Sequence, residues 1–268
     1  MIGAIIGDIA GSRFEFDNYR RKDFELFDGD SFFTDDTVMT LAVAKALLES
    51  GKDYSKLGEN CVKYMRKIGC NYPDSGYGGR FFAFIFGPDP KPYNSWGNGA
   101  AMRVSAVPYV ASSVEEVKRL SRIVTEVSHN HSEGIKGAEA AAVCGYMAMH
   151  GKTKDEIRAY VEDNYYPLDF TIDSIRDTYL FNETCQGTVP QAIEAFLESS
   201  SFEDAIRTAV SVGGDSDTLT AITGGIAEPF YGVPLTMRAK VKWMYLDKRL
   251  LTILEEFEEK YPARTSVC

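Results

Sequence analysis

The chain has 268 residues, 44% of them apolar and 12% aromatic, so it can bury a full core and does not have the composition of a disordered polypeptide. It carries 29 basic and 39 acidic residues, a net charge of −10, which argues against a groove for the phosphate backbone of nucleic acid and suits hard divalent cations that bind oxygen. The length allows one or two domains, and we expect one compact domain over residues 1–268.

The N-terminal segment and the cysteines predict a protein of the reduced cytosol. The segment MIGAIIGDIAGSRFE has no basic region, and Asp8 interrupts its apolar run, so it does not have the pattern of a signal peptide. The sequence contains no run of about 18 apolar residues, so no membrane-spanning helix is expected. The cysteines form no CxxC pair and are odd in number, so they indicate neither a zinc ribbon nor a complete disulfide framework. They are Cys61, Cys70, Cys144, Cys185 and Cys268. We therefore expect a cytoplasmic location.

Helical periodicity dominates the chain. Apolar residues recur at steps of three and four over 38–50 and 56–68. FFAFIF at 81–86 is the one serious candidate for a strand, and its short length is also compatible with a helix. A helix is expected over 114–127, where Ser113 and Glu116 have the spacing of a capping box. The same spacing recurs at Thr153 and Glu156 and at Ser201 and Asp204. Further helical patterns cover 134–149, 189–199, 218–228 and 236–258. The predicted fold class is all-α.

Two segments rich in Gly, Pro and Asn interrupt the helices. They are CNYPDSGYGGR at 70–80 and GPDPKPYNSWGNGA at 87–100. Interdomain linkers are usually polar and simple, whereas these segments contain tyrosines and a tryptophan. We therefore interpret them as binding loops. No repeat of 20–50 residues is found, which argues against a solenoid.

Two clusters of acids and threonines stand far apart in the chain. In FTDDTVMT, Thr34, Asp35 and Asp36 precede a helix expected to begin near Val38. In VGGDSDTLT, Asp215, Asp217 and Thr218 precede the helix that contains Ile222. Asp and Thr are favoured helix caps, and the helix dipole stabilises one nearby carboxylate by roughly 0.3–1 kcal/mol. One acid is sufficient for capping, so two acids in each turn indicate an additional role.

Together the clusters supply four carboxylates and two hydroxyls, which are the ligands that Mg²⁺, Mn²⁺ or Ca²⁺ prefers. Closely spaced acids can bridge two ions, and Gly213 and Gly214 allow the backbone to approach closely. We predict that each cluster is half of one site for two metal ions. A phosphatase of the haloacid dehalogenase type is a rival interpretation of DSDTLT. That motif, however, requires Thr or Val where Leu219 stands, and it precedes a doubly wound sheet, whereas helices are expected here.

Six motifs, in order, resemble the ADP-ribosylglycohydrolases. They are GDIAGSRFE, TDDT, YPDSGYGG, SWGNGAAMR, SHNHSEG and GGDSDT, and they span nearly the whole chain. The resemblance implies a compact orthogonal bundle of α-helices with two Mg²⁺ or Mn²⁺ ions between helix N-termini. It also implies hydrolysis of the bond from C1″ of the distal ribose of ADP-ribose to an acceptor.

Roles for individual residues follow from the same resemblance. The implied metal ligands are Thr34, Asp35, Asp36, Asp215, Asp217 and Thr218. Glu15 and Asp36 are the implied proton carriers in catalysis, whereas Asp8 is expected to hold the turn between the first helix and Gly11.

The expected substrate contacts lie in the two loops and beside them. They are Asp74, Ser95, Trp96, Gly97, Asn98, Gly99, Met102 and His129. The resemblance implies that the backbone N–H groups of SWGNGAAM bind the diphosphate, a role for which glycine and a following helix N-terminus are physically suited. Trp96 or a nearby tyrosine is expected to stack on adenine, and His131 to support His129.

Two other functions remain open from the sequence. An ADP-ribose-binding module without turnover would have lost a ligand in one cluster, and neither cluster has lost one. A two-metal phosphohydrolase would release inorganic phosphate instead of intact ADP-ribose. The expected partner is an ADP-ribosylated protein or a small ADP-ribose conjugate, the acceptor is not specified, and the expected state is a monomer without membrane or nucleic-acid contacts.

Overall fold

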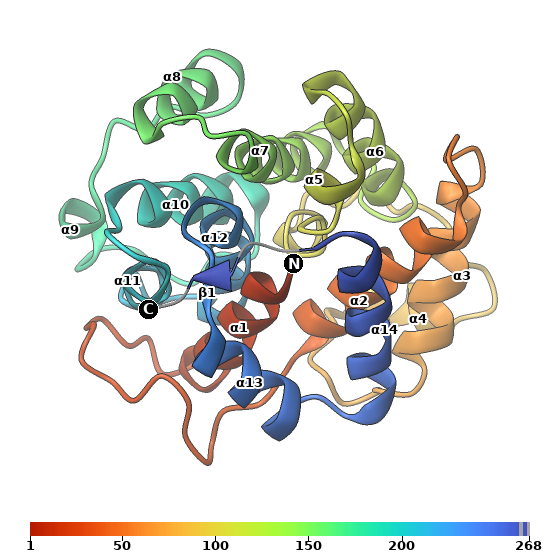
Figure 1. The fold of residues 1–268 in the computed structure, drawn as a ribbon, viewed down its shortest axis with the longest axis horizontal. Coiled ribbons are helices and arrows are strands. Elements are labelled where there is room, and N and C mark those ends of the chain that lie inside the picture. Colours follow the sequence, from red (N-terminus) through yellow and green to blue (C-terminus); the bar gives the residue numbers. More distant parts are fainter. Residues whose placement is uncertain (263–264, 267–268) are drawn as a thin grey trace.

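The computed structural model describes residues 1–262 and 265–266, which form fourteen α-helices, two short 3₁₀ turns and one pair of two-residue strands. The all-α expectation is confirmed (Figure 1). The helices are α1 (Ile2–Gly11), α2 (Asp35–Glu49), α3 (Leu57–Gly69), α4 (Gly79–Phe86), α5 (Val107–Val110), α6 (Val114–Glu126), α7 (Ser132–Met149), α8 (Lys154–Asn164), α9 (Ile172–Ile175), α10 (Cys185–Glu198), α11 (Phe202–Val210), α12 (Ser216–Tyr231), α13 (Leu235–Met244) and α14 (Lys248–Lys260). The strands β1 (Val233–Pro234) and β2 (Thr265–Ser266) pair in parallel.

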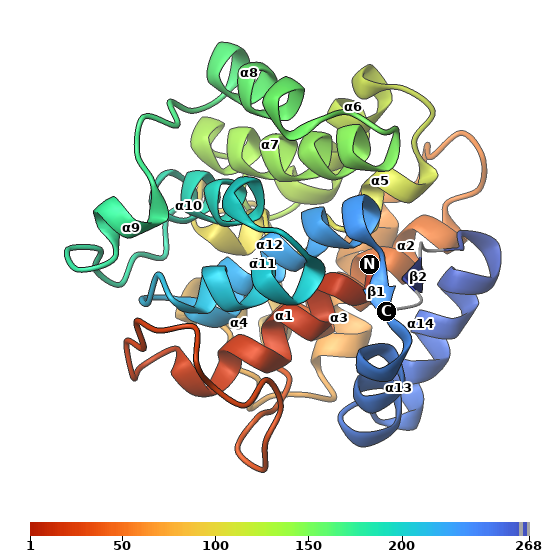
Figure 2. The same cartoon turned by 60° about the vertical axis from the view of Figure 1, so that its left-hand side comes forward.

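Helices α1 and α12 form the centre of the fold. Every residue of α1 is buried, and this helix packs along α12. Helix α12 also packs against α7, α10 and α11. Helix α2 packs against α3 and α14. Figure 2 shows the resulting layers, with α7 and α8 on one side of the central pair and α13 and α14 on the other.

Glycines at steps of four let α1 and α12 touch through their backbones. A Cβ on Gly3 would lie 2.7 Å from Cβ of Glu228, and one on Gly11 would lie 2.7 Å from Cα of Asp217. A Cβ on Gly7 would lie 2.5 Å from the carbonyl carbon of Thr220. Ordinary contacts between carbon atoms are about 3.5–4.0 Å, so only glycine allows this approach. The C-terminal end of α1 is thereby held beside the first turn of α12, where the second acidic cluster lies.

Several local expectations are corrected. FFAFIF is not a strand, because it forms α4 and buries Phe81, Phe84 and Ile85 on one face at helical spacing. The pattern at 236–258 is two helices, because the chain turns before Asp247, whose side chain accepts the N–H groups of Arg249 and Leu250 and caps α14.

The capping predictions hold in part. The reciprocal box is present at Thr153 and Glu156. Ser113 does accept the N–H of Glu116, but the carboxylate of Glu116 bonds to Ser112 instead of returning to Ser113. The arrangement at Ser201 is of the same kind, because the Asp204 carboxylate bonds to Ser200.

The thiols of the described cysteines are free. Cys61, Cys144 and Cys185 are buried and Cys70 is exposed. Cys268, the last residue of the expected domain, lies outside the described residues. Among the helices described here, none combines the length and hydrophobicity that a bilayer crossing requires.

Candidate active site

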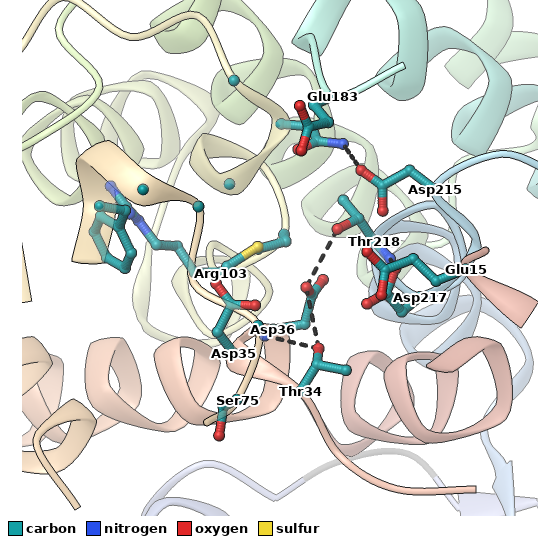
Figure 3. Close-up of a pocket in the computed structure, with 18 of the residues that line it drawn as sticks. Glu15, Thr34, Asp35, Asp36, Ser75, Arg103, Glu183, Asp215, Asp217 and Thr218 are labelled. Atoms are coloured by element: carbon teal, nitrogen blue, oxygen red, sulfur yellow. Dashed lines mark hydrogen bonds between the residues drawn. The ribbon is translucent and has the colours of Figure 1, made fainter. Parts of the chain in front are cut away.

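A cavity of about 490 Å³ opens where the N-termini of α2, α4 and α12 approach the two glycine-rich loops. It is lined by most of the residues that the sequence analysis singled out (Figure 3). These are Glu15, Thr34, Asp35, Asp36, Asp74, Ser95, Gly97, Asn98, Gly99, Met102, His129, Asp215, Asp217 and Thr218. Residues from six separate segments of the chain therefore share one cavity.

Asp8 fixes the start of α2 to α1. Its buried carboxylate accepts the backbone N–H groups of Thr34 at 2.9 Å and Thr37 at 3.0 Å, and the hydroxyl of Thr34 at 2.8 Å. The expectation that Asp8 holds the turn before Gly11 is thus wrong, because its partners lie in the first acidic cluster. Burial raises the pKa of Asp8 to about 6, although the hydrogen bonds from Thr37 and Thr34 oppose that shift.

Both helices begin slightly earlier than expected, so the acidic clusters lie at the helix starts and within the first turns. Helix α2 starts at Asp35, with Thr34 as its N-cap residue accepting the N–H of Asp36, and α12 starts at Ser216. The backbone N–H of Asp35 donates to the carbonyl of Ser75 at 2.7 Å, which anchors the 70–80 loop to α2. Capping therefore explains the presence of Thr34, but it does not explain why the acidic residues stand at both helix starts.

One hydrogen bond joins the clusters directly. The hydroxyl of Thr218 donates to Oδ2 of Asp36 at 3.2 Å, and Figure 3 shows this bond as a dashed line between the two side chains. The other carboxylate oxygen of Asp36, Oδ1, is buried and has no hydrogen-bond partner among the described residues. A buried carboxylate oxygen without a donor is costly, so this atom is suited to a cation.

The remaining acids gather on the opposite wall. Carboxylate oxygens of Glu15, Asp215 and Asp217 lie within 4.8 Å of one another. The side-chain amide of Asn98 donates to Oδ2 of Asp215 at 2.6 Å, and the N–H of Thr218 donates to Oδ1 of Asp217 at 2.9 Å. These bonds orient the two aspartates toward the cavity.

The site concentrates negative charge in a poorly solvated place. Burial, with the charge of neighbouring carboxylates, raises the pKa values of Asp35, Asp36 and Asp217 well above their ordinary range. Burial and the charges of Asp215, Asp8 and Glu183 raise the pKa of half-buried Glu15 to about 7. Divalent cations would relieve this repulsion, and the donor set consists of hard oxygens that suit Mg²⁺ or Mn²⁺.

The two consecutive glycines of the second cluster have left-handed backbones, with φ of +77° at Gly213 and +72° at Gly214. A Cβ on Gly214 would lie 2.7 Å from the ring of Tyr179. The N–H of Gly214 donates to the side chain of Asn18 at 3.1 Å, which connects this turn to the loop after α1. Glycine is therefore required at both positions for conformational and steric reasons.

The SWGNG segment is held by the chain that leads into α10. The N–H of Asn98 donates to the carbonyl of Glu183 at 2.8 Å, and the N–H of Cys185 donates to the carbonyl of Trp96 at 2.9 Å. Trp96 itself does not line the cavity. Its ring is 45% exposed and packs edge-on at 5.3 Å against His131, whose side chain caps α7.

Other residues of the cavity were not singled out from the sequence. They include Phe16, Phe32, Ser75, Arg80, Phe81, Tyr93, Arg103 and Glu183. Phe16 is 83% exposed at the cavity mouth, and its ring stacks on Phe181 at 5.9 Å. Arg103, by contrast, is fully buried although it closes the SWGNGAAMR motif, which is the sequence signal that could have identified it.

Comparison with known proteins places these observations in a family context. Residues 1–264 match the family model described as ADP-ribosylglycohydrolase. Human ADP-ribosylhydrolase ARH3 is 26% identical over 263 residues, covering 75% of this chain and 71% of that protein. ADP-ribosylarginine hydrolase Tri1 of Pseudomonas putida (strain GB-1) is 26% identical over 284 residues, covering 91% and 73%. A solved structure titled "ADP-ribosylglycohydrolase-related protein complex" has the same fold, with a TM-score of 0.68, 21% identity, and coverage of 96% and 95%.

Proposed function

The chain belongs to the ADP-ribosylglycohydrolase family, enzymes that remove ADP-ribose from a substrate, and we propose that it does so with divalent cations by cleaving the bond at C1″ of the distal ribose. The observation that carries the metal requirement is the pairing of the two acidic clusters across one cavity. Within the described part of the chain, Oδ1 of Asp36 has no donor, and three more carboxylates converge opposite it.

Two Mg²⁺ or Mn²⁺ ions are the proposed cofactors. The residues that would hold them are Thr34, Asp35, Asp36, Asp215, Asp217 and Thr218. Bound ions would neutralise these carboxylates and supply a positive field for the ribose hydroxyls and for the attacking water. Asn98 and Thr218 keep the aspartates in place for that task through the hydrogen bonds described above.

Glu15 is the proposed proton carrier. It lies at the half-exposed edge of the acidic wall, and burial, the largest cause of its raised pKa, would still favour the protonated carboxyl after cations neutralise the neighbouring carboxylates. In the overall reaction the bond from C1″ to the acceptor breaks and a bond from C1″ to a water oxygen forms. The acceptor leaves with the bonding electron pair and gains one proton, while the water loses one. Asp36 is the second candidate for this transfer, although its Oδ2 already accepts from Thr218.

The glycine turn and His129 form the proposed binding site for the diphosphate. Gly97 and Gly99 face the cavity without Cβ atoms, and the Nε2 atom of His129 lies beside them. Ser95, Met102 and Asp74 complete this wall and are proposed substrate contacts. The adenine contact assigned to Trp96 has less support, because that ring lies outside the cavity.

A product analysis tests this proposal. The purified protein is incubated with Mg²⁺ and a panel of ADP-ribosylated arginine, serine, acetyl, nucleic-acid-end and ADP-ribose-chain substrates, and the products are separated by chromatography. Release of intact ADP-ribose from at least one substrate is expected. Release of inorganic phosphate would instead indicate a phosphohydrolase, and tight ADP-ribose binding without any product would indicate a binding module.

A further inference from the structure

Arg103 is a fully buried cation behind the cavity, and it has no carboxylate partner among the described residues. Its Nη2 atom donates to the carbonyl oxygen of Thr125 at 3.3 Å and to the hydroxyl of Ser128 at 2.8 Å. Thr125 lies in the last turn of α6, where the helix dipole stabilises a positive charge. These bonds hold Nη2, whereas Nε and Nη1 have no hydrogen-bond partner among the described residues. The guanidinium donates to Ser128 in every protonation state that is accessible near neutral pH.

The Ser128 hydroxyl connects this cation to His129. Ser128 Oγ lies 2.8 Å from Nδ1 of His129, and both residues are buried. A hydroxyl has one hydrogen to donate, and the guanidinium cannot accept it, so the available acceptor is Nδ1. If Nδ1 carried the ring proton, the hydroxyl would face two donors and its own hydrogen would be buried without an acceptor. The hydrogen of the Ser128 hydroxyl has an acceptor only when Nδ1 carries no proton and the ring proton is on Nε2.

The remaining nitrogen, Nε2, faces the glycine turn. It lies 3.3 Å from the position that a Cβ on Gly99 would occupy and 3.7 Å from the corresponding position on Gly97. The rings of Tyr93 and Phe81 flank the imidazole at centroid distances of 5.4 and 5.9 Å, which restricts its rotation. An Nε2–H group at this place is a donor that points at the proposed diphosphate site.

Electrostatics favours the neutral ring. Burial lowers the pKa of His129 well below its ordinary value, and the nearby charges of Arg103 and Arg80 lower it further. The ring is therefore not an imidazolium at neutral pH, and its single proton is placed by the hydrogen bond at Nδ1.

From this geometry we propose that Arg103 and Ser128 are positioning residues that lock His129 as an Nε2–H donor for a phosphate oxygen of the substrate. The identity of the acceptor oxygen rests on the proposed function, but the state of the ring does not. In this role Arg103 and Ser128 act through His129, although Arg103 also lines the cavity.

The ring state can be read by long-range ¹H–¹⁵N correlation NMR of the Mg²⁺-loaded, ADP-ribose-free protein at pH 7. The chain contains two internal references. His131 accepts the N–H of Glu133 at Nδ1, which also places its proton on Nε2, and that bond does not involve Ser128. His150 has Nδ1 2.8 Å from the carbonyl oxygen of Tyr146, which requires a proton on Nδ1. We expect His129 to resemble His131 in carrying a proton on Nε2 and none on Nδ1, and to differ from His150.

The variant Ser128→Ala removes the hydroxyl that fixes the ring. We expect the His129 signals to move toward a mixture of the two neutral forms and the His131 signals to stay in place. ADP-ribose affinity should fall about twofold for an equal mixture, because only the Nε2–H form donates to the phosphate. The matched control is Ser121→Ala, which removes the hydroxyl of another fully buried serine in the same region. In the described structure that hydroxyl bonds only to the carbonyl of Lys118. That control should leave both the His129 signals and the affinity unchanged.

Two results would overturn the proposal. The first is a wild-type His129 that carries its proton on Nδ1 or is doubly protonated at pH 7, which is decisive even if Ser128→Ala does not fold. The second is a folded Ser128→Ala variant with the spectrum and affinity of the wild type. The test is separate from that of the proposed function, because a wild type that shows the expected ring state but releases no ADP-ribose refutes only the activity.

Discussion

Replacing Gly7 by alanine would place a methyl group between the two central helices. Its carbon would lie 2.5 Å from the carbonyl carbon of Thr220 and 2.8 Å from the amide nitrogen of Ala221, both in the backbone of α12. Because carbon contacts are normally about 3.5–4.0 Å, the helices would have to separate by about 1 Å. Overpacking of this kind typically costs 1–3 kcal/mol or more, and the higher helix propensity of alanine offsets about 1 kcal/mol of it.

Gly58→Ala is the matched control. Gly58 lies in the first turn of α3, and its added Cβ would meet side-chain atoms of Ile123 and Val127 at 3.7 and 3.9 Å, which are ordinary contacts. This variant should gain about 0.5–1 kcal/mol of helix propensity.

Thermal unfolding measures both variants. A change of 1 kcal/mol shifts the Tm of a chain near this size by about 2–4 °C. We expect Gly7→Ala to lower the Tm by several degrees and Gly58→Ala to keep or raise it. A Gly7→Ala protein as stable as the wild type would refute the backbone contact between α1 and α12.

Three further predictions concern the cavity. Glu15→Gln should slow ADP-ribose release by about 10²-fold or more while the Kd for ADP-ribose, measured by calorimetry, changes little, because the amide cannot carry the proton; unchanged turnover would transfer that role to Asp36. Gly99→Val should keep its thermal shift with Mg²⁺ and lose its shift with ADP-ribose, because the new Cβ would lie 3.3 Å from Nε2 of His129; an unchanged ADP-ribose shift would place the diphosphate elsewhere. In EDTA, the Tm should fall as the pH rises from 5 to 8. The reason is that the folded protein binds protons more tightly than the unfolded chain at Asp8 and Glu15, whose pKa values in the folded state are about 6 and about 7. The stabilisation from bound protons is complete below the ordinary pKa values of 3.8 and 4.5, and it is lost as the pH rises through the pKa values of the folded protein. Excess Mg²⁺ should reduce the fall in Tm. A Tm that rises across this pH range without metal would contradict the raised pKa values.

The helices and the two acidic clusters could be predicted because their signals are local. Helical spacing of apolar residues defines α6 and α7, and adjacent acids at a helix start are unusual enough to indicate a site. The short apolar run of α4 could not be assigned from periodicity, because six apolar residues fit a strand or a buried helix equally well. Tertiary packing decided between them.

Sequence patterns could not predict contacts between segments that are distant in the chain. Gly3, Gly7 and Gly11 stand at regular steps of four, but only the position of α12 reveals that they allow two backbones to touch. Gly99 does not have a left-handed φ, so a side chain there would meet His129 without backbone strain, which the sequence could not show. The role of Arg103 depends on the end of α6, which approaches it only in the folded chain.

The central claim is that the paired acidic clusters form a metal site that is essential for removal of ADP-ribose. The most direct measurement is the rate of ADP-ribose release from the best substrate of the panel, recorded for EDTA-treated wild type and Asp217→Ala before and after addition of Mg²⁺. We predict no release by the metal-free wild type, recovery at micromolar to millimolar Mg²⁺, and little recovery by Asp217→Ala, because that variant lacks one of the carboxylates that converge on the site. Full activity of the metal-free wild type would contradict the account.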